Sequence, residues 1–278
     1  MLRQRVVTAL IMAGTFLAAL ALLSTPALAL LFGAIMGLGA WEWSRLAGWR
    51  TPFARLVYVV MVGAVLAGLY VYCDLGGEPA RAQVQPFLGV ACLWWSFALL
   101  WVKSYPGSAV IWRNRPMRSL MGVMMLAPAW LAAVYLLSFS PRGLLLVIMV
   151  LVVAAADIGA YFAGTAFGRH KMAPAVSPKK TWEGFWGGVA ACVLLAVVLR
   201  LLAPEQYADI GILSLAAVAI AAAMASVVGD FTVSMVKRES GVKDSGNLLP
   251  GHGGVLDRLD SLCGAAPVFG LGLLLAGW

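Results

Sequence analysis

The feature that most constrains this chain is a series of apolar runs, each about as long as a helix that crosses a bilayer. The nine runs are Val6–Leu23, Ala27–Trp41, Leu56–Cys73, Val84–Val102, Leu120–Phe139, Gly143–Ala163, Phe185–Ala203, Ile210–Val228 and Leu262–Gly277. A hydrocarbon core of ~30 Å is spanned by about 20 apolar residues in a helix. The alternating pattern of a membrane β-barrel is absent. We therefore expect an all-α, polytopic integral membrane protein with about nine transmembrane helices.

Composition supports this fold class. The chain is 62% hydrophobic and 12% charged, with a mean hydropathy of +0.91. A typical soluble domain is about 45–50% apolar and about 25% charged, so a water-soluble enzyme with one buried core is excluded. Disordered chains are poor in apolar residues, so that class is excluded too.

The first thirty residues allow two interpretations. Arg3 and Arg5, an apolar stretch and the segment Pro26–Ala29 resemble a cleavable secretory signal. Eight further apolar runs follow, and for that reason we favour an uncleaved first helix.

Basic residues predict the orientation in the membrane. With a cytoplasmic N-terminus, all but three of the 20 Lys and Arg residues lie in cytoplasmic segments, the exceptions being Arg81, Arg142 and Arg200. This is the distribution that the positive-inside rule describes, and it places the C-terminus outside. The net charge of +8 is accounted for by topology and by attraction to anionic headgroups, so we expect no nucleic acid partner.

Polar clusters are concentrated after about residue 155. We therefore divide the chain into residues 1–142, with five structural, lipid-facing spans, and residues 143–278, with four spans and the catalytic loops. The four cysteines are scattered and form no CxxC pair, so neither a zinc site nor a disulfide framework is indicated.

The first cluster lies within the sixth apolar run. Asp157 is an ionisable residue at membrane depth, which makes it a functional candidate, and Tyr161 shares its helix face. The alternative is an aspartate hydrogen-bonded to a neighbouring helix, with Gly164 and Gly168 as close-packing residues.

The second cluster is the loop 177–184, which contains Ser177, Lys179, Lys180, Thr181 and Trp182. Two lysines beside a hydroxyl and an indole could bind a nucleotide or a phosphorylated headgroup. An ordinary positive-inside loop with an interfacial tryptophan is the alternative.

The third cluster is Asp230 at the end of the eighth run, either a metal ligand or a polar residue that ends the helix. The fourth runs from Ser234 to Asp260. In it, Gly251, Gly253 and Gly254 allow close backbone approach to an anion, and His252 lies among them as a phosphate or substrate contact. The ninth helix would direct its N-terminus at the same place.

Asp257 and Asp260 are spaced i, i+3 and share a helix face. Carboxylates beside an anion site indicate Mg²⁺, which binds carboxylates together with phosphate oxygens. Cations for phosphate charge are supplied by Lys237, Arg238, Lys243 and Arg258, and Asp244 adjoins them. A solvated basic loop before an acidic helix start is the alternative.

The segment Ser234–Asp260 resembles the diagnostic C-terminal motif of the phosphatidate cytidylyltransferases, or CDP-diacylglycerol synthases, without a departure from the pattern. Asp230, the loop 177–184 and the segment Asp157–Tyr161 are similar to further family features in the expected order. The resemblance covers roughly residues 150–265.

The resemblance implies that CTP and phosphatidate are converted to CDP-diacylglycerol and pyrophosphate. It implies a site with Mg²⁺ held at Asp230, Asp257 and Asp260, with Asp157 close by. Our own hypothesis from their charge is that Lys237 and Arg238 act as catalytic cations. It further implies a second, monovalent cation such as K⁺ and a homodimer. Because one substrate is lipid-anchored and the other aqueous, the topology predicts an active site at the cytoplasmic face of a bacterial-type inner membrane.

The chemistry suits these residue types. The phosphate monoester is already anionic near neutral pH, since its second pKa is about 6, so no strong general base is required. Metal ions and fixed cations bring two polyanions together. Two alternatives stay open: a CTP-dependent polyprenol or phytol kinase-like enzyme, and an ion-coupled transporter that uses Asp157.

Overall fold

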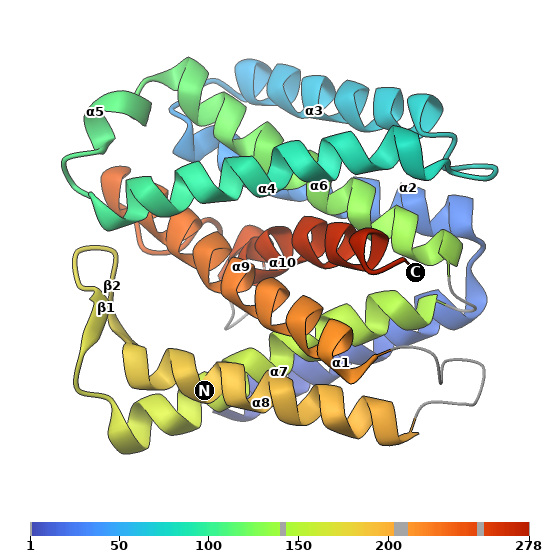
Figure 1. Cartoon of the computed structure of the whole chain (residues 1–278). Coiled ribbons are helices and arrows are strands. Elements are labelled where there is room, and N and C mark those ends of the chain that lie inside the picture. Colours follow the sequence, from blue (N-terminus) through green and yellow to red (C-terminus); the bar gives the residue numbers. More distant parts are fainter. Residues whose placement is uncertain (1, 140–142, 203–210, 249–252, 278) are drawn as a thin grey trace.

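The structure, a computed structural model, describes residues 2–139, 143–202, 211–248 and 253–277. Within these ranges the chain forms helices and one small hairpin (Figure 1). The elements in order are α1 (Leu2–Leu22), α2 (Thr25–Leu46), α3 (Pro52–Tyr72), α4 (Arg81–Lys103), α5 (Ala109–Trp112), α6 (Arg115–Phe139), α7 (Leu144–Phe167), β1 (Lys171–Ala173), β2 (Ser177–Thr181), α8 (Trp182–Leu202), α9 (Ile212–Glu239) and α10 (Leu256–Leu275).

Eight of these helices, α2–α4 and α6–α10, are long and apolar enough to cross a membrane. The described apolar stretch of α1, Val7–Leu22, is shorter. Large apolar side chains such as Val60 on α3 and Leu194 on α8 are exposed, as lipid-facing residues would be. The expected multi-spanning helical fold is confirmed, and the count of nine crossings and their orientation stay predictions.

Helix α10 lies in the middle of the bundle (Figure 1). It packs most extensively against α9, α6 and α4 and also contacts α7 and α2, while α7 and α8 contact each other along much of their length. Helices α6 and α10 are the most buried of the apolar helices, and α8 is the least. The last helix of the expected catalytic part therefore packs chiefly against α9 of the same part, and also against α6, α4 and α2 of the expected structural part.

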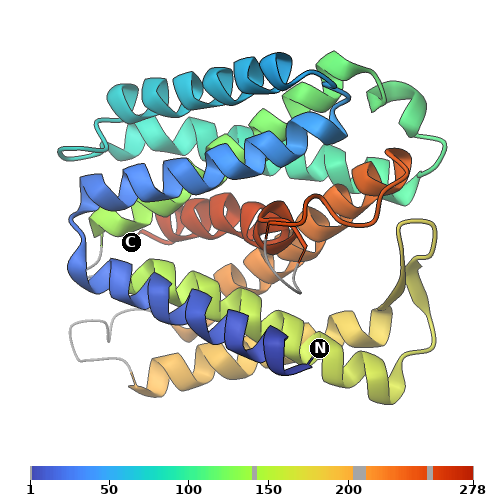
Figure 2. The ribbon, with the colours of Figure 1, turned by 180° about the vertical axis from the view of Figure 1, so that it is seen from behind.

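Four connections lie at one end of the bundle, on the left in Figure 1 and on the right in Figure 2. They join α2 to α3, α4 to α6, α7 to α8 and α9 to α10. These are the connections that the positive-inside rule assigns to the cytoplasm. The hairpin of β1 and β2 and the C-terminal end of α9, which carry several candidate residues, therefore lie at one end of the bundle.

Several helices extend beyond their apolar runs. Helix α2 continues to Leu46, α9 continues to Glu239, and α10 already begins at Leu256. Hydropathy detects only the apolar part of a helix, whereas backbone hydrogen bonding continues into polar sequence. Helix α9 ends where Gly241 adopts a φ of +70° and the N–H of Val242 donates to the carbonyl of Lys237 (3.0 Å), a C-terminal motif that favours glycine.

The segment before α8 was expected to be a loop and is instead an antiparallel hairpin of β1 and β2. Lys171 pairs with Thr181, and Ala173 pairs with Ser177. The carboxylate of Glu183 holds the base of the hairpin, accepting hydrogen bonds from the backbone N–H groups of Arg169 (3.0 Å) and His170 (3.2 Å). Glu183 lies in the first turn of α8, so the sequence of the two strands alone does not predict this contact.

Candidate active site

One face of α9 presents three of the polar side chains that the sequence singles out. Asp230, Ser234 and Lys237 are spaced i, i+4 and i+7, which places them in a row along the helix. The hydroxyl of Ser234 donates to a carboxylate oxygen of Asp230 (3.1 Å). Because α9 continues to Glu239, Asp230 does not end the helix, and Lys237 and Arg238 are helical rather than part of a loop.

A close crossing of α9 and α10 brings Asp230 near Asp260. A methyl group at Gly229 would collide with the carbonyl oxygen of Asp260, so only glycine allows the two backbones this approach. Asp260 is buried, at 8% exposure, and lies close enough to Asp230 for their charges to interact. The crossing thus brings together two carboxylates from the consecutive helices α9 and α10.

Lys180 on β2 meets this carboxylate pair. Its ammonium forms an ion pair with Asp230 and lies 4.9 Å from the centre of the Phe231 ring. Asp157 on α7 interacts electrostatically with Lys180, with Asp230 and with Arg258. Three carboxylates from α7, α9 and α10 therefore lie around one lysine of the hairpin.

Asp257 belongs to a second group of contacts, at the start of α10. One of its oxygens accepts a hydrogen bond from the Lys237 ammonium (2.6 Å). The other accepts from the backbone N–H groups of Ser245 and Gly254, each at 2.9 Å. The side chains of Lys237 and Asp257 are 10% and 6% exposed, so this is a buried ion pair that organises the α9–α10 connection.

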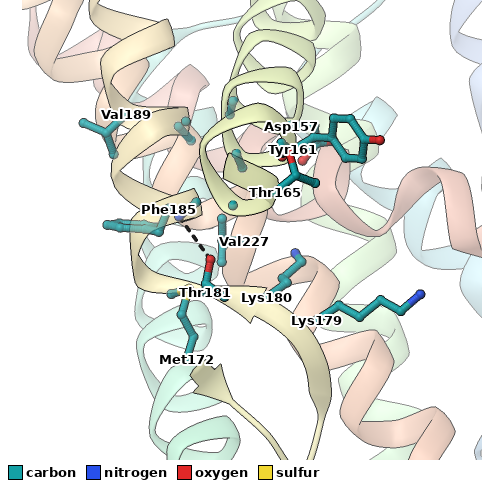
Figure 3. A pocket seen from close by; sticks show the side chains of 16 residues that line it. Asp157, Tyr161, Thr165, Met172, Lys179, Lys180, Thr181, Phe185, Val189 and Val227 are labelled. Carbon is teal, nitrogen blue, oxygen red and sulfur yellow. Dashed lines mark hydrogen bonds between the residues drawn. The ribbon is translucent and has the colours of Figure 1, made fainter. Parts of the chain in front are cut away.

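A cavity of about 330 Å³ opens beside the carboxylates, between α7, α8, α9 and β2. Figure 3 shows Asp157 and Lys180 at its polar part, with Phe185, Val189 and Val227 among its apolar walls. Tyr161, Gly164, Thr165, Lys179 and Thr181 also line it. The cavity can accept a ligand with an anionic end and an apolar body.

Other residues singled out by the sequence lie elsewhere. The guanidinium of Arg238 donates to the carbonyl of Val176 (3.3 Å) and so ties α9 to the hairpin. Lys243, Asp244 and Trp182 are exposed, and none of them lines the cavity. Ser177 is half-buried in the strand, and Gly168, Gly253 and Gly254 lie outside the cavity walls. Gly251 and His252 fall outside the described residues.

Sequence reasoning missed two residues of α2, Glu42 and Arg45. The Glu42 carboxylate accepts hydrogen bonds from the Ser245 hydroxyl (2.8 Å) and from the start of α10. The Arg45 guanidinium donates to the carbonyl of Ser245 (2.7 Å). The apolar run ends at Trp41, so hydropathy alone places Glu42 beyond the helix. An acidic residue directly beside such a run was the available signal.

The donor chemistry of the site fits Mg²⁺. In the described ranges no three His, Cys, Asp or Glu side chains lie close enough together to hold a metal ion. Mg²⁺, however, is usually bound through one or two carboxylates together with substrate phosphates rather than by an all-protein cage. The Asp230–Asp260 pair provides such hard oxygen donors.

Comparison with known proteins identifies the chain's relatives. The model of the cytidylyltransferase family matches residues 3–275. The chain is 45% identical to a phosphatidate cytidylyltransferase of Pseudomonas aeruginosa, over 100% of this chain and 99% of that protein. It is 41% identical to one of Haemophilus influenzae, over 97% of each chain. A relative in Brucella suis is 48% identical over 44% of this chain and 43% of its own.

Proposed function

This chain belongs to the cytidylyltransferase family, and from that premise we propose that it converts CTP and phosphatidate to CDP-diacylglycerol and pyrophosphate. The observation that carries the proposal is the 45% identity to a phosphatidate cytidylyltransferase along the whole chain. The site supports it independently, because cations and carboxylates lie beside an apolar cavity. A substrate with a phosphate on an apolar body suits both features.

The reaction is an in-line displacement at the α-phosphorus of CTP. An oxygen of the phosphatidate phosphate forms the new P–O bond, the bond to the β-phosphate oxygen breaks, and pyrophosphate leaves with the electron pair. The attacking group is already anionic near neutral pH, so no side chain has to remove a proton. The chain's main task is to hold two polyanions together against their repulsion.

Cationic side chains are the residues that would do this. Lys180 lies at the polar part of the cavity, where it would contact the lipid phosphate. Lys237 and the exposed Arg258 would neutralise charge on the triphosphate, and Arg238 fixes the hairpin that carries Lys180. Lys179, Thr181 and Tyr161 line the cavity around the lipid.

A divalent metal such as Mg²⁺ would supply charge neutralisation between the two phosphate groups when it is bound. Asp230 and Asp260 would hold it, with Asp157 beside them. Asp257 would join them by sharing an oxygen that already accepts the Lys237 ammonium, just as Asp230 would share the oxygen that pairs with Lys180. A monovalent cation such as K⁺ accompanies the divalent ion in this proposal, as the family resemblance implies.

The proposed place of reaction is the cytoplasmic face of a bacterial inner membrane. The distribution of basic residues supports this orientation. The hairpin that carries Lys180 also lies at the bundle end that holds the corresponding connections (Figure 1). A homodimer is proposed from the family resemblance, and light scattering of the detergent-purified chain measures it.

Pyrophosphate release by detergent-purified protein tests the function. We expect release only when CTP, phosphatidate and Mg²⁺ are all present, and we expect chelation of the metal to abolish it. The kinase-like alternative is tested by replacing phosphatidate with a free polyprenol or phytol. Such an enzyme would transfer the γ-phosphate of CTP to the alcohol, and it would release CDP and no pyrophosphate. Absence of phosphatidate-dependent release would overturn the proposal.

A further inference from the structure

A buried carboxylate of the first half of the chain reaches the connection between α9 and α10. Glu42, near the end of α2, is only 7% exposed. One of its oxygens accepts from the backbone N–H of Val255 (3.0 Å), and the other accepts from the N–H of Leu256 (2.9 Å). Burying a carboxylate is costly unless hydrogen bonds compensate it, and these contacts do so.

The Glu42 carboxylate also fixes the other side of this connection. It accepts the hydroxyl of Ser245 (2.8 Å), while Arg45, one helical turn further along α2, donates to the carbonyl of Ser245 (2.7 Å). Methyl groups at Gly246 or Gly254 would collide with the Glu42 carboxylate, so the backbone is in close contact with it on both sides. Two turns of α2 thus hold Ser245 and the start of α10 together.

Ser245 connects Glu42 to the buried ion pair. Its hydroxyl contacts Glu42, and its backbone N–H donates to Asp257 (2.9 Å). Asp257 in turn accepts the Lys237 ammonium (2.6 Å). A displacement of Ser245 would therefore disturb Asp257 directly, and it would disturb the Lys237 ammonium through Asp257.

A simple helix cap does not account for this arrangement. A serine, threonine or asparagine at the start of α10 would satisfy the free N–H groups locally. The N-cap residue is Val255, which has no side chain that can do so. The carboxylate comes instead from a helix more than two hundred residues earlier, and it sets the position of α10 relative to α2.

We propose that Glu42 is a positioning residue for the transfer reaction: through Ser245 and the start of α10 it holds Asp257 and Lys237 in their working geometry. This inference rests on the proposed function, since it assigns Lys237 a task in that reaction. Glu42 itself touches neither substrate.

Glu42→Gln is the main variant, with Glu78→Gln as its matched control. The amide oxygen of glutamine can accept from one of the two backbone N–H groups, but its NH₂ group then faces the other donor. Glu78 is exposed in the connection after α3, so the same change there should leave turnover unaltered. Misplacement of reacting groups costs up to about 10²-fold in rate, and for Glu42→Gln we expect kcat to fall about 10- to 100-fold.

A double variant separates positioning from general damage. If Glu42 acts through Lys237, its loss adds little once Lys237 is gone, because residues that act as a unit are non-additive. We expect Glu42→Gln with Lys237→Met to lie within about threefold of Lys237→Met alone. A merely structural role would multiply the two losses. Because Lys237→Met is expected to retain little activity, both variants are assayed at high enzyme concentration.

Failure of this inference and failure of the proposed function give different results. An inactive wild-type chain contradicts the function, whereas an active wild type with unchanged kcat in Glu42→Gln contradicts only the positioning role. Multiplicative losses overturn it as well. If Glu42→Gln does not yield folded protein, Ser245→Ala replaces it, because this variant removes one contact only. There we expect a fall of about three- to tenfold in kcat that disappears in the Lys237→Met background.

Discussion

Replacing Asp257 with asparagine tests the role of the buried pair at the start of α10. The carboxylate accepts the Lys237 ammonium at 2.6 Å and two backbone N–H groups at 2.9 Å. Asparagine keeps the shape and one acceptor oxygen, but it carries no charge. Its NH₂ group must face either the ammonium or the two N–H donors, and all of these are donors themselves.

The expected loss is large because both partners are buried, at 10% exposure for the Lys237 side chain and 6% for Asp257. Removing one partner of such a pair leaves the other charge uncompensated, which costs about 3–5 kcal/mol. Replacing both charges avoids this cost and is often neutral. We therefore expect Lys237→Met to restore most of the stability that Asp257→Asn loses.

Heat inactivation in detergent at a fixed scan rate is the assay, because the apparent melting temperature of an irreversible transition depends on the scan rate. The fraction of monodisperse protein after heating is compared among the wild type, both single variants and the double variant. Activity should stay low in all three variants even where stability returns. The reasoning is refuted if Asp257→Asn melts with the wild type, or if the double variant is less stable than Asp257→Asn.

Three further outcomes are expected. Lys180→Met should lower phosphatidate-dependent pyrophosphate release about 10²- to 10³-fold, since one cationic contact to the reacting phosphates is lost. The control is Lys171→Met at the exposed start of β1, which should stay within twofold of the wild type. Equal effects of the two changes would contradict the cavity's role. Gly229→Ala should destabilise the chain by about 1–3 kcal/mol, because its methyl meets the backbone of α10; Gly63→Ala, with nothing within 4 Å, is the control for heat inactivation. Burial raises the pKa of the Tyr105 phenol, and the nearby Glu239 carboxylate raises it further. The difference in absorbance at 295 nm between the wild type and Tyr105→Phe should therefore titrate with a midpoint above about 10. Any stability that this neutral phenol contributes is present below that pH and lost as the pH rises through the higher folded-state pKa; a midpoint at or below 10 would contradict the burial argument.

Several features of the site could be predicted from local sequence. Asp157, Asp230 and Asp260 stand out because a carboxylate in or beside an apolar run is costly and therefore seldom accidental. Lys180 was found as a cation beside polar residues, although its neighbour Lys179 could not be distinguished from it. In the structure Lys180 pairs with Asp230, and Figure 3 shows the two lysine side chains pointing in different directions.

Other features depend on contacts between distant segments. The hairpin forms because β1 pairs with β2 and Glu183 caps its base, so no residue pattern within 177–181 predicts it alone. Glu42 was missed because its partners, Ser245 and Leu256, follow it by about two hundred residues. The helical extension of α9 was missed because hydropathy falls before the backbone hydrogen bonding ends.

The sequence by itself therefore determined the membrane class, the approximate positions of the eight long apolar helices and the residue types available for chemistry. These follow from the local cost of placing apolar or charged groups in water or lipid, which each short segment carries on its own. Only the tertiary structure decided which carboxylates meet. Asp230 and Asp260 are neighbours because Gly229 lets two helices cross closely, whereas Asp257, three residues before Asp260, faces Lys237 instead. Such pairings are set by helix packing, and packing is a property of the whole chain.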